Sequence, residues 1–594
     1  MRISKIIVIL VAIIAGFIAT QAQPLQKSTV TIYYGGNIVT MEGDKPTYVE
    51  AIAVKDGIIT YVGKLSQAKN KYKKAQMHDL KNKTMLPGFF GPHLHFTGLG
   101  GQAISANLLA EPDGKVGDIP TLINTLKEWA KGPDLNRTGW IFGMGYDDAV
   151  LKEGRHPTKF DLDKVSTTLP VIAIHISGHF AVMNSVGLKM MGITAKTKDP
   201  KGGIIRRVKG SQEPNGVLEE LAAIPAYMSI ISPKKKDDIF YFLEKAQELA
   251  VSFGYTTVQE GRAFGDAHTN LVNYAKEKGF KLDVVSYLDY SMKDENVEGF
   301  SCSGNHINKA EKHDYVVDYS KMKSPWTGGR YSGGYRVAGM KITLDGSPQG
   351  RTAWSKTPYL VPPDGQKEGY SGYPAFSKDS DLEALFALAF KNNWQMLIHA
   401  NGNAAIDQLI RVMKPVAKKY GNEDRRNVLV HGVFLEREQY ADLKELHIIP
   451  SMFTMHTFYW GDWYKKIIGE KRAQRIAPAK SLLDAGFPVT IHTDAPVALP
   501  NLMQIVWASV NRVSRSGEVM GADECITPYQ ALKAITITSA YQHFEEKQKG
   551  SLKVGKLADL VILSDNPMTI NPMLINKIQV MKTIKKGESI YRLK

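Results

Sequence analysis

The residues best suited to chemistry are histidines and one aspartate that follow short apolar runs. His93 and His95 alternate around Leu94, so both imidazoles would face the same way on a strand. Three later runs also end in titratable residues: His399 after 396–398, His431 after 428–430, and His492 with Asp494 after 489–491. Imidazole nitrogens and carboxylate oxygens are ligands that suit zinc and similar divalent ions. The pattern therefore predicts a metal site.

Lys341 is a second unusual residue, because it interrupts an apolar run. The even positions from Ala338 to Leu344 are apolar, which would turn Lys341 to the opposite, inward face. A bare ammonium in such a place is costly unless it is paired or chemically altered. Two alternatives stay open. Lys341 pairs with an inner carboxylate such as Asp345 or Glu260, or it reacts with CO₂ to form a carbamate that bridges two metal ions.

The other histidines and the two cysteines carry weaker signals. His179 follows the apolar run 171–174 and could line the same site. Seven histidines in polar or loop contexts are interpreted as having no functional role: His78, His156, His268, His306, His313, His447 and His543. Cys302 and Cys525 are too few for a cysteine-based zinc site, although they leave one disulfide bridge open.

A parallel sheet would bring these residues together, because the carboxyl ends of its strands meet at one edge. Apolar runs alternate with helical stretches such as 381–391 and 404–419, which is typical of βα units. With the segment at His93, eight strands are expected, the others being 171–174, 256–259, 339–344, 395–398, 428–430, 448–452 and 489–491. The expectation is an α/β fold with a (β/α)₈ TIM barrel over residues 84–548, interrupted by an insertion at about 101–250.

Both ends of the chain are predicted to be β. Asp56-Gly57 lies between two apolar strands and indicates a type I′ hairpin. Residues 28–83 and 549–594 are expected to pair into one small composite β-sandwich, since chain termini often lie close together.

The first residues have the pattern of a secretory signal peptide. Arg2 and Lys5 precede an apolar stretch at 6–19, which is shorter than the ~20 residues that a membrane helix needs. We expect residues 1–22 to be cleaved after Ala22, which predicts a secreted or periplasmic protein. Since no second long apolar run exists, no stable membrane span is expected after cleavage.

Composition excludes several classes of protein. Hydrophobic residues make up 43% and charged residues 23% of the chain, as in ordinary globular proteins. The net charge is +16, but the basic residues are scattered, and the two densest runs, 71–74 and 234–236, lie far apart. A nucleic-acid-binding protein should concentrate them on one face, so no nucleic acid partner is expected.

These motifs together resemble the amidohydrolase superfamily, most closely its family 3 branch of YtcJ-like metal-dependent hydrolases. The similar segments are 87–95, 178–185, 254–260, 341–347, 350–353, 399–402, His431, 494–496 and 550–561, which extend over nearly the whole chain after residue 22. Two positions depart from the branch: Asn403 replaces its usual aspartate, and His492-Thr493-Asp494 replaces Gly-Ser-Asp.

The resemblance implies a metal-dependent hydrolase of C–N bonds, most simply an amide bond of a small molecule. It implies one or two divalent ions, zinc first, held by His93, His95, Lys341, His399, His431 and Asp494. Asp494 would also accept the proton of the attacking water, and His179 would stabilise the developing oxyanion. Arg351 would bind a substrate carboxylate, and Trp460 and Trp463 within 458–464 would wall an apolar pocket.

Two other functions stay open at this point. The same metal site could serve a deaminase or a hydrolase of cyclic amides. The barrel could also be a catalytically dead, secreted binding protein, although its complete set of ligands argues against that. The sequence leaves a homo-oligomer open as well.

Overall fold

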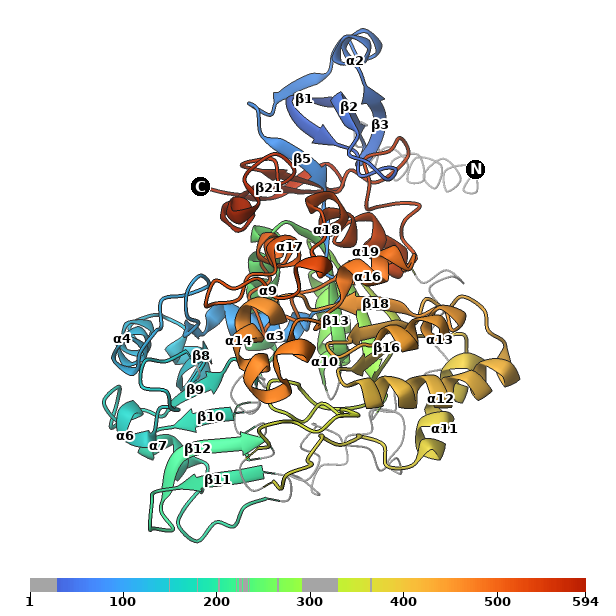
Figure 1. Cartoon of the computed structure of the whole chain (residues 1–594). Coiled ribbons are helices and arrows are strands. Elements are labelled where there is room, and N and C mark those ends of the chain that lie inside the picture. The colour runs from blue at the N-terminus through green and yellow to red at the C-terminus, as the bar shows by residue number, and fades with distance from the viewer. Residues whose placement is uncertain are drawn as a thin grey trace, which may run out of the picture.

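The computed structural model describes residues 29–594 except 149, 179, 201–202, 221, 224–226, 228–232, 234, 264–265, 291–329 and 364–365. The predicted signal peptide, His179 and Cys302 lie outside these residues. Three β-sheets organise the described chain: one at the top of Figure 1, one in the centre and one at the lower left.

The central sheet is parallel throughout and curls around the site. It has eight strands in the order β19-β18-β17-β16-β15-β14-β13-β6. Their bounds are β6 (Phe89–Phe90), β13 (Tyr255–Ala263), β14 (Asp283–Asp289), β15 (Tyr335–Thr343), β16 (Gln395–Ala400), β17 (Val428–His431), β18 (Ile449–Met452) and β19 (Thr490–Ile491). Nearly all of these residues are buried, as expected for parallel strands covered on both faces.

The predicted membership of this sheet is wrong in one strand. The run 171–174 forms β9 (Val171–His175) of a different sheet, and β14 takes the place expected for it. β14 begins and ends with aspartate and has Ser286 in its middle, so its sequence looks less apolar than that of β9. Its two aspartates are nevertheless buried, because Lys549 binds Asp283 and Arg262 binds Asp289 inside the protein.

Helices cover the outer face of the central sheet, as the alternating pattern predicts. The longest are α9 (Lys236–Ser252), α10 (Ala267–Glu277), α11 (Asp379–Lys391), α12 (Asn403–Tyr420), α14 (His456–Ile468) and α17 (Leu502–Asn511). α11 and α12 confirm the helices expected at 381–391 and 404–419. One large hydrophobic core joins these helices to the outward-facing residues of the strands.

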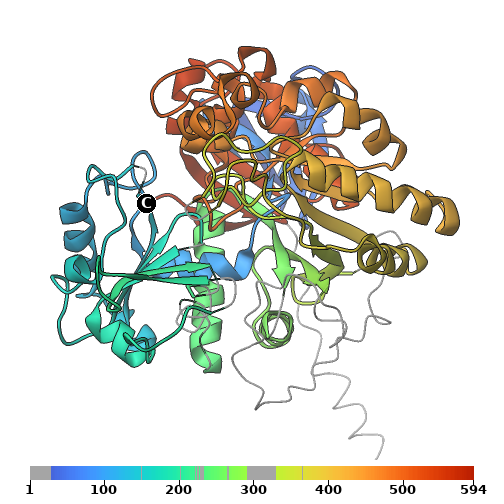
Figure 2. The same ribbon diagram turned by 60° about the horizontal axis from the view of Figure 1, so that its bottom comes forward.

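A six-stranded sheet lies between β6 and β13 in the sequence and projects to one side of the central sheet (Figures 1 and 2). Its order is β11-β12-β10-β9-β8-β7, with β7 (Ala106–Asn107), β8 (Ile141–Tyr146), β10 (Phe180–Met183), β11 (Gly203–Arg207) and β12 (Pro214–Glu220). We call it the inserted sheet. Helix α3 (Phe96–Ile104) enters it and packs against α9, which leads back to the central sheet.

The third sheet contains strands from both ends of the chain. Its order is β22-β21-β20-β5-β1-β2-β3, and β4 (Gln76–Asp79) pairs with β1. The strands are β1 (Thr31–Val39), β2 (Tyr48–Lys55), β3 (Ile58–Gly63), β5 (Thr84–Pro87), β20 (Leu560–Leu563), β21 (Val580–Lys585) and β22 (Glu588–Arg592). Asp56 and Gly57 both have positive φ angles, 50° and 76°, which confirms the predicted type I′ turn.

A buried ionic network fastens the last part of the chain beneath the central sheet. Lys549 and Lys585 both donate to Oδ2 of Asp283 on β14, at 2.6 and 2.5 Å, and Lys549 also pairs with Glu545. Burial raises the pKa of Asp283, but the two ammonium groups outweigh it and hold that pKa below its usual range. The paired charges therefore stay ionised in the interior.

Within the described residues, no helix is long and apolar enough to cross a membrane.

Candidate metal centre

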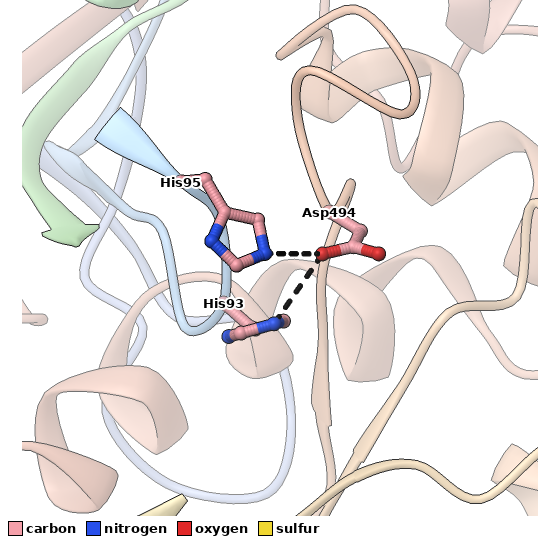
Figure 3. A group of neighbouring side chains, drawn as sticks. All are labelled: His93, His95 and Asp494. Carbon is pink, nitrogen blue, oxygen red and sulfur yellow. Dashed lines mark ion pairs between the residues drawn. The ribbon is translucent and has the colours of Figure 1, made fainter. Parts of the chain in front are cut away.

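Three of the predicted ligands meet at the carboxyl end of the central sheet (Figure 3). Oδ1 of Asp494 lies 3.3 Å from Nε2 of His93 and 3.5 Å from Nε2 of His95. His93 is buried, while the side chain of His95 is 29% exposed, so the group opens to one side. Two imidazoles and a carboxylate in this arrangement provide three protein ligands and leave space for water or substrate.

The hydrogen bonds of His93 show which of its nitrogens is available. Nδ1 lies 2.7 Å from Oε1 of Gln259, whose amide nitrogen donates to the carbonyl of Pro92. The amide oxygen can only accept, so Nδ1 carries the proton and Nε2 presents its lone pair to Asp494. Neither Nε2 of His93 nor Oδ1 of Asp494 has a hydrogen-bond donor among the described residues. A lone pair facing a carboxylate oxygen is favourable only with a cation between them.

The buried imidazoles of His93, His399 and His431 are neutral, which prepares them to bind metal. Burial and, to a smaller extent, the nearby charge of Lys341 lower the pKa of His93 and of His399 to about 3. Burial likewise holds the pKa of His431 well below its usual range. The pKa of Asp494 is held well below its usual range although burial opposes this, so its carboxylate is ionised at neutral pH. At neutral pH no proton has to leave these three rings before metal binds.

His399 and His431 extend the site along the next two strands. Their rings are 4.5 Å apart, and Nε2 of His431 lies 3.9 Å from Oδ2 of Asp494. Val428 and Val430 face the interior cluster, so simple alternation would turn His431 outward. Its φ angle of 79° reverses that direction, and Asp494 has a φ angle of 51°. Such strained backbone is often found at functional sites.

Lys341 lies in the interior, as expected, although the alternation around it is incomplete. Met340, Ile342 and Leu344 join the outer core, but Ala338 belongs to the interior cluster, because the register shifts near Gly339. The suggested carboxylate partners bind elsewhere. Asp345 accepts from the backbone N–H groups of residues 354, 401 and 402, and Glu260 accepts from Thr97. Burial lowers the pKa of Lys341 to about 7.

Sequence reasoning gave little weight to two neighbours of the ligands. Gln259 appeared only as part of a β13 motif, yet it fixes the ring of His93. Glu260 holds the start of α3 through Thr97, and its Oε1 lies 4.0 Å from Nδ1 of His95. The polar residues of an otherwise apolar strand, Thr256 to Glu260, were the signal that could have identified both.

The two departures from the branch have different surroundings. The side-chain nitrogen of Asn403 donates to Glu436 at 2.8 Å, and its oxygen accepts from the backbone of Lys356. An aspartate there would repel Glu436. His492 follows β19 of the central sheet, with its ring 5.1 Å from the rings of both His93 and His431. It is fully buried, and neither of its ring nitrogens has a hydrogen-bond partner among the described residues.

The residues predicted to contact substrate lie in varied positions. Arg351 donates to the carbonyls of Val361 and Pro362 and stacks over Trp463. Trp463 donates to the carbonyl of Gln349, and Trp460 is buried in α14 against Phe453 and His456. His179 lies outside the described residues. The substrate roles of these four residues therefore stay predictions.

The sequence is similar along most of its length to named bacterial proteins. A Bacillus subtilis protein that carries the name amidohydrolase YtcJ is 26% identical over 94% of this chain and 99% of its own length. The N-substituted formamide deformylase of Arthrobacter pascens is 24% identical over 93% of this chain and 96% of its own length.

The fold has a solved counterpart as well. A metal-dependent hydrolase of Pyrococcus horikoshii has a TM-score of 0.68 at 22% identity, over 92% of this chain and 99% of the other. The model of the amidohydrolase family matches residues 76–591, a range that holds every ligand described above. The chain belongs to the amidohydrolase family.

Proposed function

We propose that this protein hydrolyses the C–N bond of a small amide at the site around His93, His95 and Asp494. The observation that carries the proposal is the convergence of both Nε2 atoms on Oδ1 of Asp494, at 3.3 and 3.5 Å. A cation bound there would polarise the scissile carbonyl and lower the pKa of a bound water.

The protein's own side chains supply the rest of the chemistry. Asp494 is the proposed base: it takes the proton of the attacking water and returns it to the leaving amine. Its carboxylate is ionised at neutral pH and has Oδ2 turned toward His431. His95 is more exposed than His93 and borders the space where substrate would enter. His179 remains the proposed stabiliser of the oxyanion.

The metal we propose is zinc, as one or two ions. Imidazole with carboxylate is a common zinc ligand set, and His399, His431 and a carbamate on Lys341 would provide a second position. A neutral amine is the form of lysine that reacts with CO₂. The lowered pKa of Lys341 supports that reaction at neutral pH.

Three further proposals concern architecture and location. The central sheet is a closed (β/α)₈ barrel, supported by the hydrogen bond of 2.8 Å from His95 N to Ala495 O, which joins the first and last strand ends. The third sheet, which contains strands from both ends of the chain, is part of a composite β-sandwich, supported by the pairing of β5 with β20. The protein is secreted or periplasmic, supported by the N-terminal pattern, and N-terminal sequencing of the mature protein tests it.

The substrate class we propose is a small N-substituted amide, with N-substituted formamides first. Similarity to the Arthrobacter deformylase along nearly the whole of both chains supports this choice. A deaminase or cyclic-amide hydrolase is the alternative activity at the same site.

The experiment combines metal content with turnover. Purified protein is assayed for zinc, manganese and cobalt, and then with formamides, larger amides, cyclic amides and aminopurines. The variant His93→Ala/His95→Ala, which lacks two ligands of the proposed catalytic metal, serves as the control. We expect metal-dependent release of amine from formamides, absent in the control. Faster turnover of cyclic amides or aminopurines would favour the alternative, and no turnover of any class would favour the binding protein.

A further inference from the structure

A second group of metal-ligating side chains lies in the inserted sheet, outside the site described above. Asp147 and Asp148 follow β8, and His175 ends the neighbouring strand β9. One ligand atom from each lies within 4.8 Å of the others. Because β8 and β9 are parallel and adjacent, their carboxyl ends bring these residues together much as the central sheet brings together its own ligands.

The imidazole of His175 is directed into this group. Its side chain is more than nine-tenths buried, and Nε2 lies 3.0 Å from Oδ1 of Asp148 and 3.8 Å from Oδ1 of Asp147. Although burial opposes it, the hydrogen bonds and charges of Asp147 and Asp148 raise the pKa of His175 to about 9, so a metal ion here would have to displace a proton from its ring. Nδ1 lies 2.8 Å from Oγ of Ser177, which can accept its proton. In that tautomer the lone pair of Nε2 points at the two carboxylates, as in His93.

A fourth donor stands beside the group. Nε2 of His156 lies 3.7 Å from Oδ2 of Asp148, and Nδ1 of His156 is 3.0 Å from the hydroxyl of Tyr146. The interpretation of His156 as a loop histidine without a role is therefore revised: it is buried, and its ring centroid is 5.8 Å from that of His175. Two carboxylates and two imidazoles form a set of oxygen and nitrogen donors that suits Zn²⁺.

A simpler arrangement competes with metal binding. The backbone N–H of Ser177 donates to Nδ1 of His175 at 3.1 Å. When Nδ1 accepts this hydrogen bond, the ring proton is on Nε2. His175 is then only an ion-pair partner of the two aspartates. The two arrangements differ in one measurable respect, the number of metal ions that the inserted sheet holds.

We propose that Asp147, Asp148, His175 and His156 form a second Zn²⁺ site, separate from the catalytic one. Because three of its ligands come from the ends of β8 and β9, the ion would tie these two strand ends together. Its occupancy does not depend on the proposed activity, so the two proposals can fail separately.

The test counts zinc in four forms of the full chain: the native protein, Asp147→Asn/His175→Gln, His93→Ala/His95→Ala, and the combination of all four substitutions. Each is stripped with chelator, reloaded with Zn²⁺ and analysed for metal, with circular dichroism as a check on folding. Asp163→Asn is the matched control, because its carboxylate binds Ser185 in the same part of the chain, outside the group.

We expect Asp147→Asn/His175→Gln to lose one Zn²⁺ per chain and Asp163→Asn to lose none. The combined variant should hold one fewer than His93→Ala/His95→Ala. The proposal would be overturned if Asp147→Asn/His175→Gln held as much zinc as the native protein and the combined variant held as much as His93→Ala/His95→Ala. His175 would then be assigned to the ion pair. If Asp147→Asn/His175→Gln fails to fold, zinc titration of His93→Ala/His95→Ala decides: one tightly bound ion that His156→Gln weakens supports the site, and binding unaffected by His156→Gln refutes it.

Discussion

The imidazole of His93 lies against the backbone of Gly261 so closely that a Cβ atom on Gly261 would be 2.5 Å from Cε1 of His93. The same Cβ atom would lie 2.9 Å from the carbonyl oxygen of Leu94. Only glycine leaves room for the ring in its present position. The spacing between β6 and β13 therefore depends on this residue.

Replacing Gly261 with alanine should displace His93 and weaken metal binding. We expect Gly261→Ala to lose most of its metal at concentrations that saturate the native protein, with a parallel loss of activity. Gly117→Ala is the control, because a Cβ at Gly117 meets nothing within 4 Å. Metal analysis after dialysis against a weak chelator measures the difference. Native metal content in Gly261→Ala would show that the ring can shift without cost.

Gln259 should matter for metal affinity through the proton on Nδ1 of His93. Partners of this kind typically change metal affinity or activity by ~10–100-fold. We expect Gln259→Leu to weaken metal binding by about that factor, while Gln259→Glu retains more of it. Gln408→Leu removes a buried glutamine that binds Phe376 and Asp379 instead, and it should leave affinity unchanged. Competition with a chromophoric chelator gives the dissociation constants.

Asp494→Asn should separate catalysis from folding. Asparagine tolerates the positive φ angle at this position, so the backbone can keep its conformation. The amide cannot accept the proton of the attacking water, and general base catalysis is worth roughly 10²–10⁴ in rate. We expect kcat to fall by about that factor while at least one metal and the melting temperature are retained. Near-native kcat in a metal-loaded variant would assign the base to another residue, with His492 and Glu260 as candidates.

Lys341 should carry the carbamate only when its amine is neutral. Burial lowers its pKa to about 7, so the neutral form increases as the pH rises through 7. Reconstitution with zinc and ¹³C-bicarbonate should therefore proceed further at pH 8 than at pH 6 and give a carbamate signal by NMR. Lys341→Ala should lose the signal and activity, with partial rescue by short carboxylic acids. An unmodified lysine together with full metal loading would count against the carbamate.

Asp283 should make stability depend on pH in the acid range. Its pKa in the folded protein is held below the ~3.9 of an unfolded chain, so its contribution is present above about pH 4 and is lost as the pH falls further. Asp283→Asn leaves Lys549 and Lys585 without this partner, which should cost ~3–5 kcal/mol at pH 7.

Chemical denaturation at several pH values tests this. The difference between native protein and Asp283→Asn should narrow as the pH falls below 4. Asp379→Asn breaks a half-exposed ion pair with Arg411 and should change stability little. A difference that does not vary with pH would mean that Asp283 stabilises by shape and not by charge.

The ligands could be predicted from sequence because each follows a short apolar run. The carboxyl ends of parallel strands meet at one edge of the sheet, which brings these residues together. His93, His95 and Asp494 meet although their strands lie at opposite ends of the central sheet order. The inward direction of His431 could not be predicted by alternation, since it depends on a positive φ angle that histidine rarely adopts.

Other features depend on contacts between distant segments. β14 was missed because Asp283 and Asp289 make it look like a loop, whereas their partners Lys549 and Arg262 lie on other elements. β9 was assigned to the wrong sheet because an apolar run does not indicate which sheet it joins. His175 and Asp148 gave no signal, since neither belongs to a spaced motif and only the pairing of β8 with β9 brings them together.

The pairing of β5 with β20 has a consequence for how the protein is made. β5 leads directly into β6, which is followed by His93, yet the antiparallel partner of β5 is β20 (Leu560–Leu563), far along the chain. During synthesis His93 and His95 emerge long before Asp494. The strand β20, which pairs with β5, emerges later still. A nascent chain therefore offers a metal ion only part of its coordination shell. Stable loading must wait until Leu560–Leu563 has been synthesised and has paired with β5, so metal capture would follow the docking of this late strand.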